Sequence, residues 1–314
     1  MRDGLRRLSL GLNRFEATQR ATVEWFFYGL GELLICADAL NNAMTLSTHH
    51  FDSSRAQARQ VQMAHKLAQA IMQGQLKVHY QPEFQIDAHR LVSLEALCRW
   101  HDAELNHVAP DEFIALAESK GLIVPLGAEI LRLVLTDMPE LLQRWPHARV
   151  AINASGLELE QAGFASQFLA AVDGVNPAYA MHLELEVTES IFHRDLPTVR
   201  HNLEQLKARG LTLAIDDFGT GQSSLSRLHT LPFDKIKMDK SFVQGLADPM
   251  VRAIVKGMVD LTKSFDRALV AEGVETAAEL KVLREIGCSL VQGYLLSAPK
   301  PLAQLPVIFE WPSD

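Results

Sequence analysis

Seven short segments of the chain share one pattern, in which an apolar and often β-branched run ends in a polar side chain. Such runs are typical of strands that are buried on both faces and covered by helices. A (β/α)₈ barrel uses polar residues at successive strand ends to bring chemistry to one rim. The polar residues at these seven strand ends are Glu95, Asn153, Glu186, the pair Asp216 and Asp217, Lys237, Glu272 and Gln292.

The same alternation predicts the order of strands and helices from Leu76 onward. Only Asp87, Ala88 and His89 separate the first two strands, which is too short a link for a crossover between parallel strands. These strands must form a hairpin, so the predicted fold class is α/β, a TIM-like (β/α)₈ barrel with one antiparallel strand. We expect strands at 76–84, 91–99, 148–154, 181–188, 211–217, 234–239, 268–273 and 289–295. We expect helices near 111–119, 126–144, 157–172, 195–209, 222–230, 249–265 and 276–286.

Residues 1–58 lack this pattern and are predicted to form a small helical N-terminal segment ahead of a barrel at 59–314. The run at 23–42 indicates one or two helices, and Asp52-Ser53-Ser54 is a cap signal for a helix that leads into the barrel. Glu24 and Glu32 interrupt the apolar stretch, which is also shorter than the ~18 apolar residues of a membrane span. A buried or docking helix is therefore favoured over a signal peptide or a membrane contact.

Composition narrows the choice of partners. The chain has 314 residues, of which 48% are hydrophobic and 22% are charged, values that are ordinary for a globular protein. The net charge of −8 argues against a nucleic-acid polymer as partner, because such a partner needs a basic face. Cys36, Cys98 and Cys288 show no CxxC spacing, which predicts reduced thiols and a cytoplasmic protein.

Five carboxylates, an Asn and a Lys at one mouth would repel each other unless cations lay among them. Glu95, Asn153, Glu186 and Asp216 offer hard oxygen ligands, which suit Mg²⁺ or Mn²⁺. The adjacent Asp216 and Asp217 can diverge and, with Glu272, hold a second ion. Two ions ~4 Å apart can share a hydroxide nucleophile and neutralise the transition state of phosphoryl chemistry.

Eight short motifs follow one another along the chain. They are Tyr80-Gln81-Pro82, Glu95-Ala96-Leu97-Cys98-Arg99-Trp100, Asn153-Ala154-Ser155, Glu186-Val187-Thr188-Glu189, Asp216-Asp217-Phe218-Gly219-Thr220-Gly221, Lys237-Met238-Asp239, Ala271-Glu272-Gly273-Val274-Glu275-Thr276 and Gln292-Gly293-Tyr294. In this order and at these separations, they resemble the EAL-domain cyclic di-GMP phosphodiesterases over about residues 60–305. The resemblance implies hydrolysis of cyclic di-GMP to linear pGpG in bacterial signalling, two Mg²⁺ or Mn²⁺ ions with inhibition by Ca²⁺, and a homodimer.

The resemblance also implies roles for individual residues. Lys237 and Gln292 would hold the nucleophilic water or stabilise developing charge, and Glu189 would brace the loop at 216–221 and couple the site to dimerisation. Glu272 would serve both as metal ligand and in catalysis. The residues expected to contact the substrate are Gln81, Leu97, Arg99, Asp239 and Glu275. For Asp239 and Glu275, a helix cap or a surface charge is the competing interpretation.

Two rival functions share this pattern. A receptor that binds cyclic di-GMP without cleaving it is disfavoured because the metal-ligand set is complete. An enolase-like barrel with Lys237 as base is disfavoured by the pair Asp216 and Asp217. Departures from the family are Gln222, Met238, the loop 101–108 and Ala298-Pro299-Lys300. The stretch 36–44 resembles the last helix of a degenerate GGDEF domain, and the absence of a GGDEF motif excludes cyclase activity.

Overall fold

The computed structural model describes residues 51–194, 196–219 and 231–312. The predicted helices at 23–42, the GGDEF-like stretch and the predicted helix at 222–230 lie outside the described residues. The first half contains α2 (Phe51–Met72), β1 (Lys77–Gln85), β2 (Arg90–Asp102), β3 (Asn106–Val108), α3 (Pro110–Ser119), α4 (Ile123–Arg144), β4 (Arg149–Asn153), α5 (Gly156–Leu159) and α6 (Phe164–Val175). The second half contains η1 (Pro177–His182), β5 (Leu183–Thr188), η2 (Glu189–His193), α7 (Leu196–Ala208), β6 (Thr212–Phe218), β7 (Lys235–Met238), α8 (Lys240–Gln244), α9 (Pro249–Ser264), β8 (Ala268–Ala271), α10 (Ala277–Ile286), β9 (Leu290–Gln292) and η4 (Leu302–Gln304).

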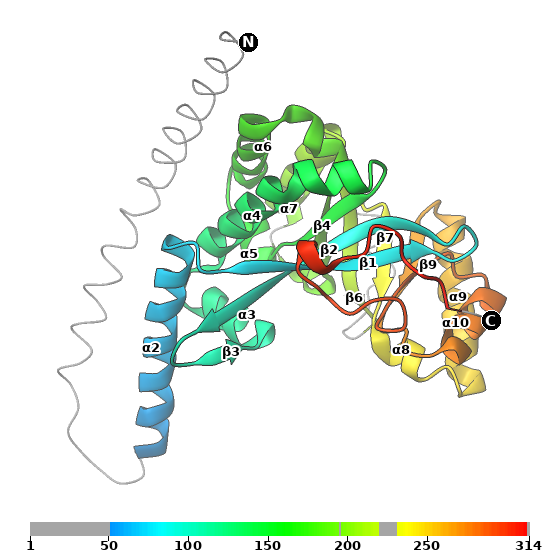
Figure 1. Cartoon of the computed structure of the whole chain (residues 1–314), viewed down its shortest axis with the longest axis horizontal. Coiled ribbons are helices and arrows are strands. Elements are labelled where there is room, and N and C mark those ends of the chain that lie inside the picture. The colour runs from blue at the N-terminus through cyan, green and yellow to red at the C-terminus, as the bar shows by residue number, and fades with distance from the viewer. Residues whose placement is uncertain (1–50, 195, 220–230, 313–314) are drawn as a thin grey trace.

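Eight strands close into a barrel in the order β1-β9-β8-β7-β6-β5-β4-β2, and β2 pairs back with β1. All neighbouring pairs are parallel except those of β1, which is antiparallel to both β2 and β9. The helices lie outside this barrel (Figure 1). The predicted TIM-like barrel with one antiparallel strand is confirmed, and the short link at 86–89 is the hairpin turn that the sequence required.

The structure corrects two details of the sequence prediction. The helix predicted at 157–172 is two helices, α5 and α6, because the chain turns at Gly163 in a left-handed conformation (φ 85°). The short strand β3 lies within the loop predicted at 101–108 and pairs antiparallel with the end of β2. The β2–β3 hairpin therefore continues past the barrel as an arm, defined here as residues 97–108.

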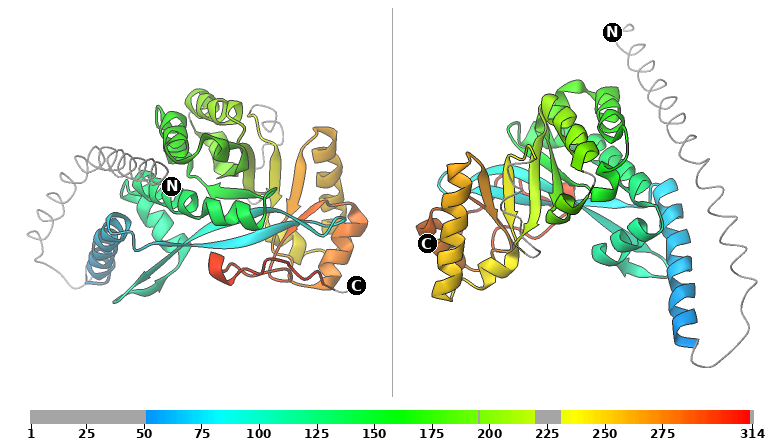
Figure 2. Two further views of the ribbon diagram at one scale, coloured as in Figure 1. Left: turned by 45° about the horizontal axis from the view of Figure 1, so that its top comes forward. Right: turned by 180° about the vertical axis from the view of Figure 1, so that it is seen from behind.

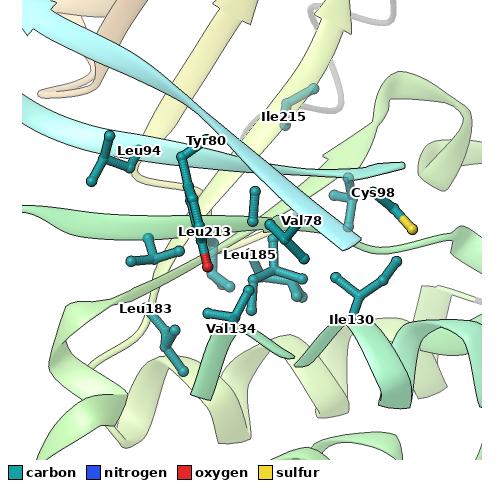
Figure 3. Packing of buried hydrophobic residues seen from close by; sticks show 14 of the residues in the cluster. Val78, Tyr80, Leu94, Cys98, Ile130, Val134, Leu183, Leu185, Leu213 and Ile215 are labelled. Atoms are coloured by element: carbon teal, nitrogen blue, oxygen red, sulfur yellow. The ribbon is translucent and has the colours of Figure 1, made fainter. Parts of the chain in front are cut away.

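The outer face of the sheet packs on the helices through apolar side chains. Figure 3 shows Leu183, Leu185 and Leu213 from the sheet packed near Val134 of α4. Tyr80 is fully buried among them, and its hydroxyl donates a hydrogen bond to Asp137 Oδ2 at 2.7 Å. This packing leaves the opposite, inward side of each strand to form the interior of the barrel.

Helix α2 lies at one side of the molecule, next to α3 and the arm (Figures 1 and 2). Lys66 Nζ of α2 lies 2.9 Å from Asp102 Oδ1 and 3.2 Å from Glu104 Oε2. Because α2 runs from Phe51 to Met72, the boundary predicted between residues 58 and 59 falls inside a helix. Within the described part of the chain, no helix combines the length and the apolar character needed to cross a membrane.

Candidate metal centre

Lys237 of β7 lies at the centre of an acidic cluster inside the barrel. Its side chain is 1% exposed, and its Nζ lies 2.6 Å from Glu272 Oε1 and 2.7 Å from Glu186 Oε2. Glu95 Oε2 and Asp216 Oδ1 each lie 3.3 Å from the same nitrogen. Burial opposes the charge, but the four carboxylates raise the pKa of Lys237 well above its usual value. Lys237 is therefore held as a cation, which disfavours the enolase-like role as a base.

One lysine does not balance the carboxylates that surround it. Burial raises the pKa of Glu186 well above its usual value, and repulsion from Glu95 and Asp216 adds to the effect. The pKa of Glu272 is raised to about 8, first by burial and then by Asp216 and Glu95. Burial and the neighbouring Asp216 also raise the pKa of Asp217. The raised carboxyl pKa values mean that burial and mutual repulsion outweigh the attraction of Lys237, and bound cations would supply the missing positive charge.

The carboxylates form two groups, and within each group the ligand atoms all lie within 4.8 Å of one another. The first group is Glu95, Glu186 and Asp216, and the second is Asp216, Asp217 and Glu272. Because Asp216 belongs to both groups, two ions bound there would be neighbours. Glu186 Oε1 is buried and has no hydrogen-bond partner among the described residues. An unpartnered, buried carboxylate oxygen facing other carboxylates fits a divalent hard cation.

The backbone explains how two consecutive aspartates reach one site. Residues next to each other in a regular strand point to opposite faces. Here the pairing of β6 with β7 is irregular between Ile215 and Phe218, and Asp217 has a left-handed φ of 52°. The Asp217 amide donates to Asp216 Oδ1 at 3.0 Å. This irregular strand end brings both carboxylates to the mouth of the barrel.

The side-chain amides of Asn153 on β4 and Gln292 on β9 hydrogen-bond to Glu95 of β2. Asn153 Nδ2 donates to Glu95 Oε1 at 2.8 Å, and Gln292 Nε2 donates to Glu95 Oε2 at 2.7 Å. Gln292 Nε2 also lies 3.2 Å from Gln81 Oε1. Although burial raises the pKa of Glu95, Lys237 together with Asn153 and Gln292 holds it below its usual value. Glu95 therefore stays ionised, as a metal ligand must.

Glu189 is buried and begins η2, directly after β5. Its Oε2 accepts a hydrogen bond from the Gly219 amide at 3.2 Å. Gly219 has a φ of 100°, and a Cβ there would lie 2.5 Å from Phe242 Cε2, so only glycine fits. The structure thus places Glu189 against the first part of the segment that the resemblance assigned to it, while Thr220 and Gly221 lie outside the described residues.

The predicted substrate residues differ in position. Leu97 and Arg99 are half-buried on β2, on the same side of the strand as Glu95. Asp239 caps α8, because its Oδ1 accepts from the Ser241 amide at 3.0 Å, and its charge also raises the pKa of Asp217. Glu275 is exposed just before α10. The helix-cap interpretation therefore applies to Asp239, which nevertheless remains close to the cluster.

Sequence reasoning missed a second ionic layer directly below the first. Lys235 Nζ lies 2.9 Å from Glu83 Oε2 and 2.8 Å from Glu184 Oε1, and all three side chains are buried. Glu184 and Lys235 precede Glu186 and Lys237 by two residues on the same strands, and Glu83 follows Gln81 by two. This two-residue spacing of charged residues in apolar runs was the available signal, because alternate residues of a strand face the same side.

The fold and this cluster agree with comparisons to known proteins. The EAL domain family model matches residues 64–299, and the chain belongs to this family. The chain is 39% identical over 249 residues to the cyclic di-GMP phosphodiesterase NbdA of Pseudomonas aeruginosa, covering 79% of this chain and 32% of NbdA. It is 40% identical over 255 residues to the bifunctional diguanylate cyclase/cyclic di-GMP phosphodiesterase MucR of the same organism, covering 78% of this chain and 36% of MucR.

Solved structures give the same family. The PaMucR phosphodiesterase in complex with c-di-GMP aligns with a TM-score of 0.71 and 38% identity, over 77% of this chain and 99% of that one. The EAL enzyme Bd1971 bound to cAMP and cyclic di-GMP aligns with a TM-score of 0.74 and 27% identity, over 82% and 70%. The chain spans about a third of the length of the curated relatives NbdA and MucR.

Proposed function

We propose that this protein is a metal-dependent phosphodiesterase that hydrolyses cyclic di-GMP to linear pGpG. The observation that carries the proposal is the pair of carboxylate groups that share Asp216 and surround Lys237 at the mouth of the barrel. Membership of the EAL family and the names of the relatives support the choice of substrate. A receptor that does not cleave its ligand is supported less well, because the carboxylates converge with an excess of negative charge.

Glu95, Asn153, Glu186 and Asp216 would hold one ion, and Asp216, Asp217 and Glu272 the second. When bound, two Mg²⁺ or Mn²⁺ ions supply a water of lowered pKa and neutralise charge on the phosphoryl oxygens. Lys237 stabilises the charge that develops on these oxygens, since burial makes its interaction strong. The hydrolysis breaks the P–O3′ bond, so that the water oxygen remains on the 5′-phosphate and the leaving oxygen takes up a proton.

The remaining site residues act by position. Gln292 orients the attacking water through the amide that already holds Glu95, and Glu189 keeps Asp216 and Asp217 in place through Gly219. Gln81, Leu97 and Arg99 contact the dinucleotide, and Arg99 pairs with a phosphate oxygen. Asp239 and Glu275 lie on the guanine side. The proposal includes a homodimer. It also includes a cytoplasmic location, because the free thiols of Cys98 and Cys288 suit a reducing compartment.

The direct test incubates the purified chain with cyclic di-GMP and Mg²⁺ or Mn²⁺ and resolves the products by chromatography. We expect pGpG to accumulate and EDTA to stop the reaction. Glu95→Gln is the matched control, because it keeps the shape of the side chain and removes its charge. Tight binding of cyclic di-GMP without formation of pGpG would contradict the proposed phosphodiesterase activity and support the receptor function.

Calcium should inhibit this reaction. Ca²⁺ accepts the same oxygen ligands but forms longer bonds and takes more of them, so it misplaces ligands that must hold two ions close together. We expect added Ca²⁺ to compete with Mg²⁺. At saturating Ca²⁺, only a small fraction of the turnover measured with Mg²⁺ should remain. Equal rates with the two ions would contradict a mechanism that depends on the spacing of the two carboxylate groups.

A further inference from the structure

A buried glutamate, Glu158, lies just beyond the strand end that carries Asn153. Strand β4 ends at Asn153, and Ser155 two residues later caps the short helix α5, in which Glu158 is the third residue. Only 5% of Glu158 is exposed, and α5 lies beside α4 on the outside of the barrel (Figure 1). Asn153 itself donates a hydrogen bond to Glu95 Oε1 at 2.8 Å, so the turn between β4 and α5 begins at the first carboxylate group.

Two helices of the barrel wall hold this turn through Ser155 and Glu158. The two residues form a capping box, in which Glu158 Oε2 accepts a hydrogen bond from the Ser155 amide at 2.8 Å. The Ser155 hydroxyl donates to Glu118 Oε1 of α3 at 2.5 Å. The other carboxyl oxygen of Glu158 touches α4, because a Cβ at Gly127 would lie 2.0 Å from Glu158 Oε1. The start of α5 is therefore tied to α3 and α4 together.

The carboxyl group of Glu158 has no cation beside it among the described residues. Arg194, the basic residue near the start of α5, pairs with Glu160 instead, with Nη1 3.6 Å from Glu160 Oε2. The charged group that faces Glu158 is Glu118. Burial raises the pKa of Glu158 to about 8, the amide that it accepts opposes the rise, and Glu118 adds to it. The side chain is thus neutral at pH 7 and lies between Glu118 and α4 without repulsion.

We propose that Glu158 is a positioning residue for the metal centre, which holds the turn after β4 so that Asn153 can serve as a ligand. This inference rests on the proposed function, in which Asn153 binds the first ion. Only one residue separates Asn153 from the cap at Ser155, so a displacement of the cap moves the ligand as well. The contact requires the neutral carboxyl, because an ionised Glu158 would face Glu118 in a buried place and push the turn away. Metal affinity should therefore depend on the proton of Glu158.

The test measures Mg²⁺ binding by calorimetry, which does not require turnover, about one pH unit below and above the pKa of Glu158. Glu158→Ala removes the carboxyl group, whereas Glu158→Gln keeps an oxygen that accepts the Ser155 amide but cannot ionise. The matched control is Glu160→Ala, which removes a carboxylate two residues further along the chain that pairs with Arg194. Far-UV spectra and melting curves at both pH values verify that each variant is folded.

At the lower pH we expect Glu158→Ala to weaken Mg²⁺ binding about tenfold, the size of a lost helix-cap interaction, while Glu158→Gln and the control stay within about twofold of the wild type. At the higher pH we expect Glu158→Gln to bind Mg²⁺ about fivefold more tightly than the wild type, because only the wild type ionises at this position. The variants are compared at one pH, since the ligand carboxylates titrate in all of them. If Glu158→Ala does not fold, the comparison of Glu158→Gln with the wild type decides.

A folded Glu158→Ala with wild-type Mg²⁺ affinity and a lower melting temperature would make Glu158 a purely structural residue and overturn the proposal. Equal affinities of Glu158→Gln and the wild type at the higher pH would overturn it as well. Either result leaves the proposed function standing. If the wild type binds Mg²⁺ but does not cleave cyclic di-GMP, the proposed function fails, and the same affinities still decide the role of Glu158. A wild type that binds no Mg²⁺ would reject both.

Discussion

Two layers of charge lie one above the other inside the barrel, and they use the same residue types. In the lower layer one lysine, Lys235, meets two carboxylates, Glu83 and Glu184, all buried. In the upper layer one lysine, Lys237, meets four carboxylates, and Asp217 lies beside them. The carboxylates outnumber the lysine by one in the lower layer and by four in the upper layer. This larger excess of negative charge distinguishes a site for cations from a structural ion pair.

The two layers are built by the same strands. Glu184 and Glu186 lie on β5, and Lys235 and Lys237 lie on β7, each pair separated by one residue. Small buried residues fill the lower layer at Ser93, Ala151 and Ala214 and leave room for the long ionic side chains. The lower layer therefore fixes the relative heights of strands that carry the residues of the upper layer. Three predictions test this comparison, and a fourth concerns a buried carboxylate outside both layers.

The largest effect is expected in the upper layer, from Glu95→Ala. The change removes a carboxylate of the first group and its bonds with Asn153, Gln292 and Lys237, so hydrolysis should be abolished. Because Lys237, Asn153 and Gln292 hold the pKa of Glu95 below its usual value, the ionised carboxylate stabilises the fold, and the melting temperature in EDTA should fall. Turnover at saturating Mg²⁺ and melting in EDTA measure the two effects. Wild-type turnover would show that Glu95 holds no metal.

In the lower layer, Lys235→Met should act on stability. It leaves Glu83 and Glu184 buried together without their cation, and breaking a buried pair in this way costs about 3–5 kcal/mol of unfolding free energy. Urea unfolding in EDTA measures the loss. The control combines Lys235→Met with Glu83→Gln and Glu184→Gln, and we expect it to recover most of the stability. If the single change were neutral, the lower layer would not be a structural ion pair.

Glu189→Gln tests whether the upper layer depends on its supporting hydrogen bond. The change weakens the contact with the Gly219 amide without removing a ligand. A displacement of about 1 Å can cost ~10²-fold in rate, so we expect a loss of that order and weaker apparent Mg²⁺ affinity. Kinetics across a Mg²⁺ titration are the measurement, with the far-UV spectrum as control. Unchanged turnover and a slightly lower melting temperature would instead make Glu189 a simple first-turn carboxylate.

The last prediction concerns Glu158, a buried carboxylate outside both layers that has no ion-pair partner among the described residues. Burial raises its pKa to about 8, repulsion by Glu118 adds to this, and the Ser155 amide opposes it. The folded chain thus keeps this proton up to about pH 8, whereas the unfolded chain releases it near the ordinary glutamate pKa of 4.5. Stability from this group is present below pH 4.5 and is lost as the pH rises to about 8.

Glu158→Gln should therefore gain stability relative to the wild type between these pH values, by at most about 1.4 kcal/mol per pH unit. Urea unfolding at several pH values gives the two profiles. Parallel profiles would show that the carboxyl is ionised in the folded protein.

The sequence predicted the upper layer because its residues stand where apolar runs end. The lower layer was hidden because Glu83, Glu184 and Lys235 stand inside such runs, and their partners come from strands far apart in the chain. The divergence of Asp216 and Asp217 depends on an irregular pairing with β7 that no local pattern encodes. The hairpin of β1 and β2 was predictable because it follows from the length of one turn. Strand β3 was not, because three residues carry too little pattern.

The pairing of β1 with β9 has a consequence for the order of events on the ribosome. Glu83 pairs with Gln292, so the barrel is sealed by one of the first strands and the last strand to be made. During most of synthesis β1 has an unpaired edge, and such edges invite pairing with other chains. Glu95 likewise lacks the hydrogen bond from Gln292 until β9 has been made. Until residue 292 has emerged, the nascent chain therefore exposes an open strand edge to other chains, and the closing of the barrel depends on the synthesis of β9.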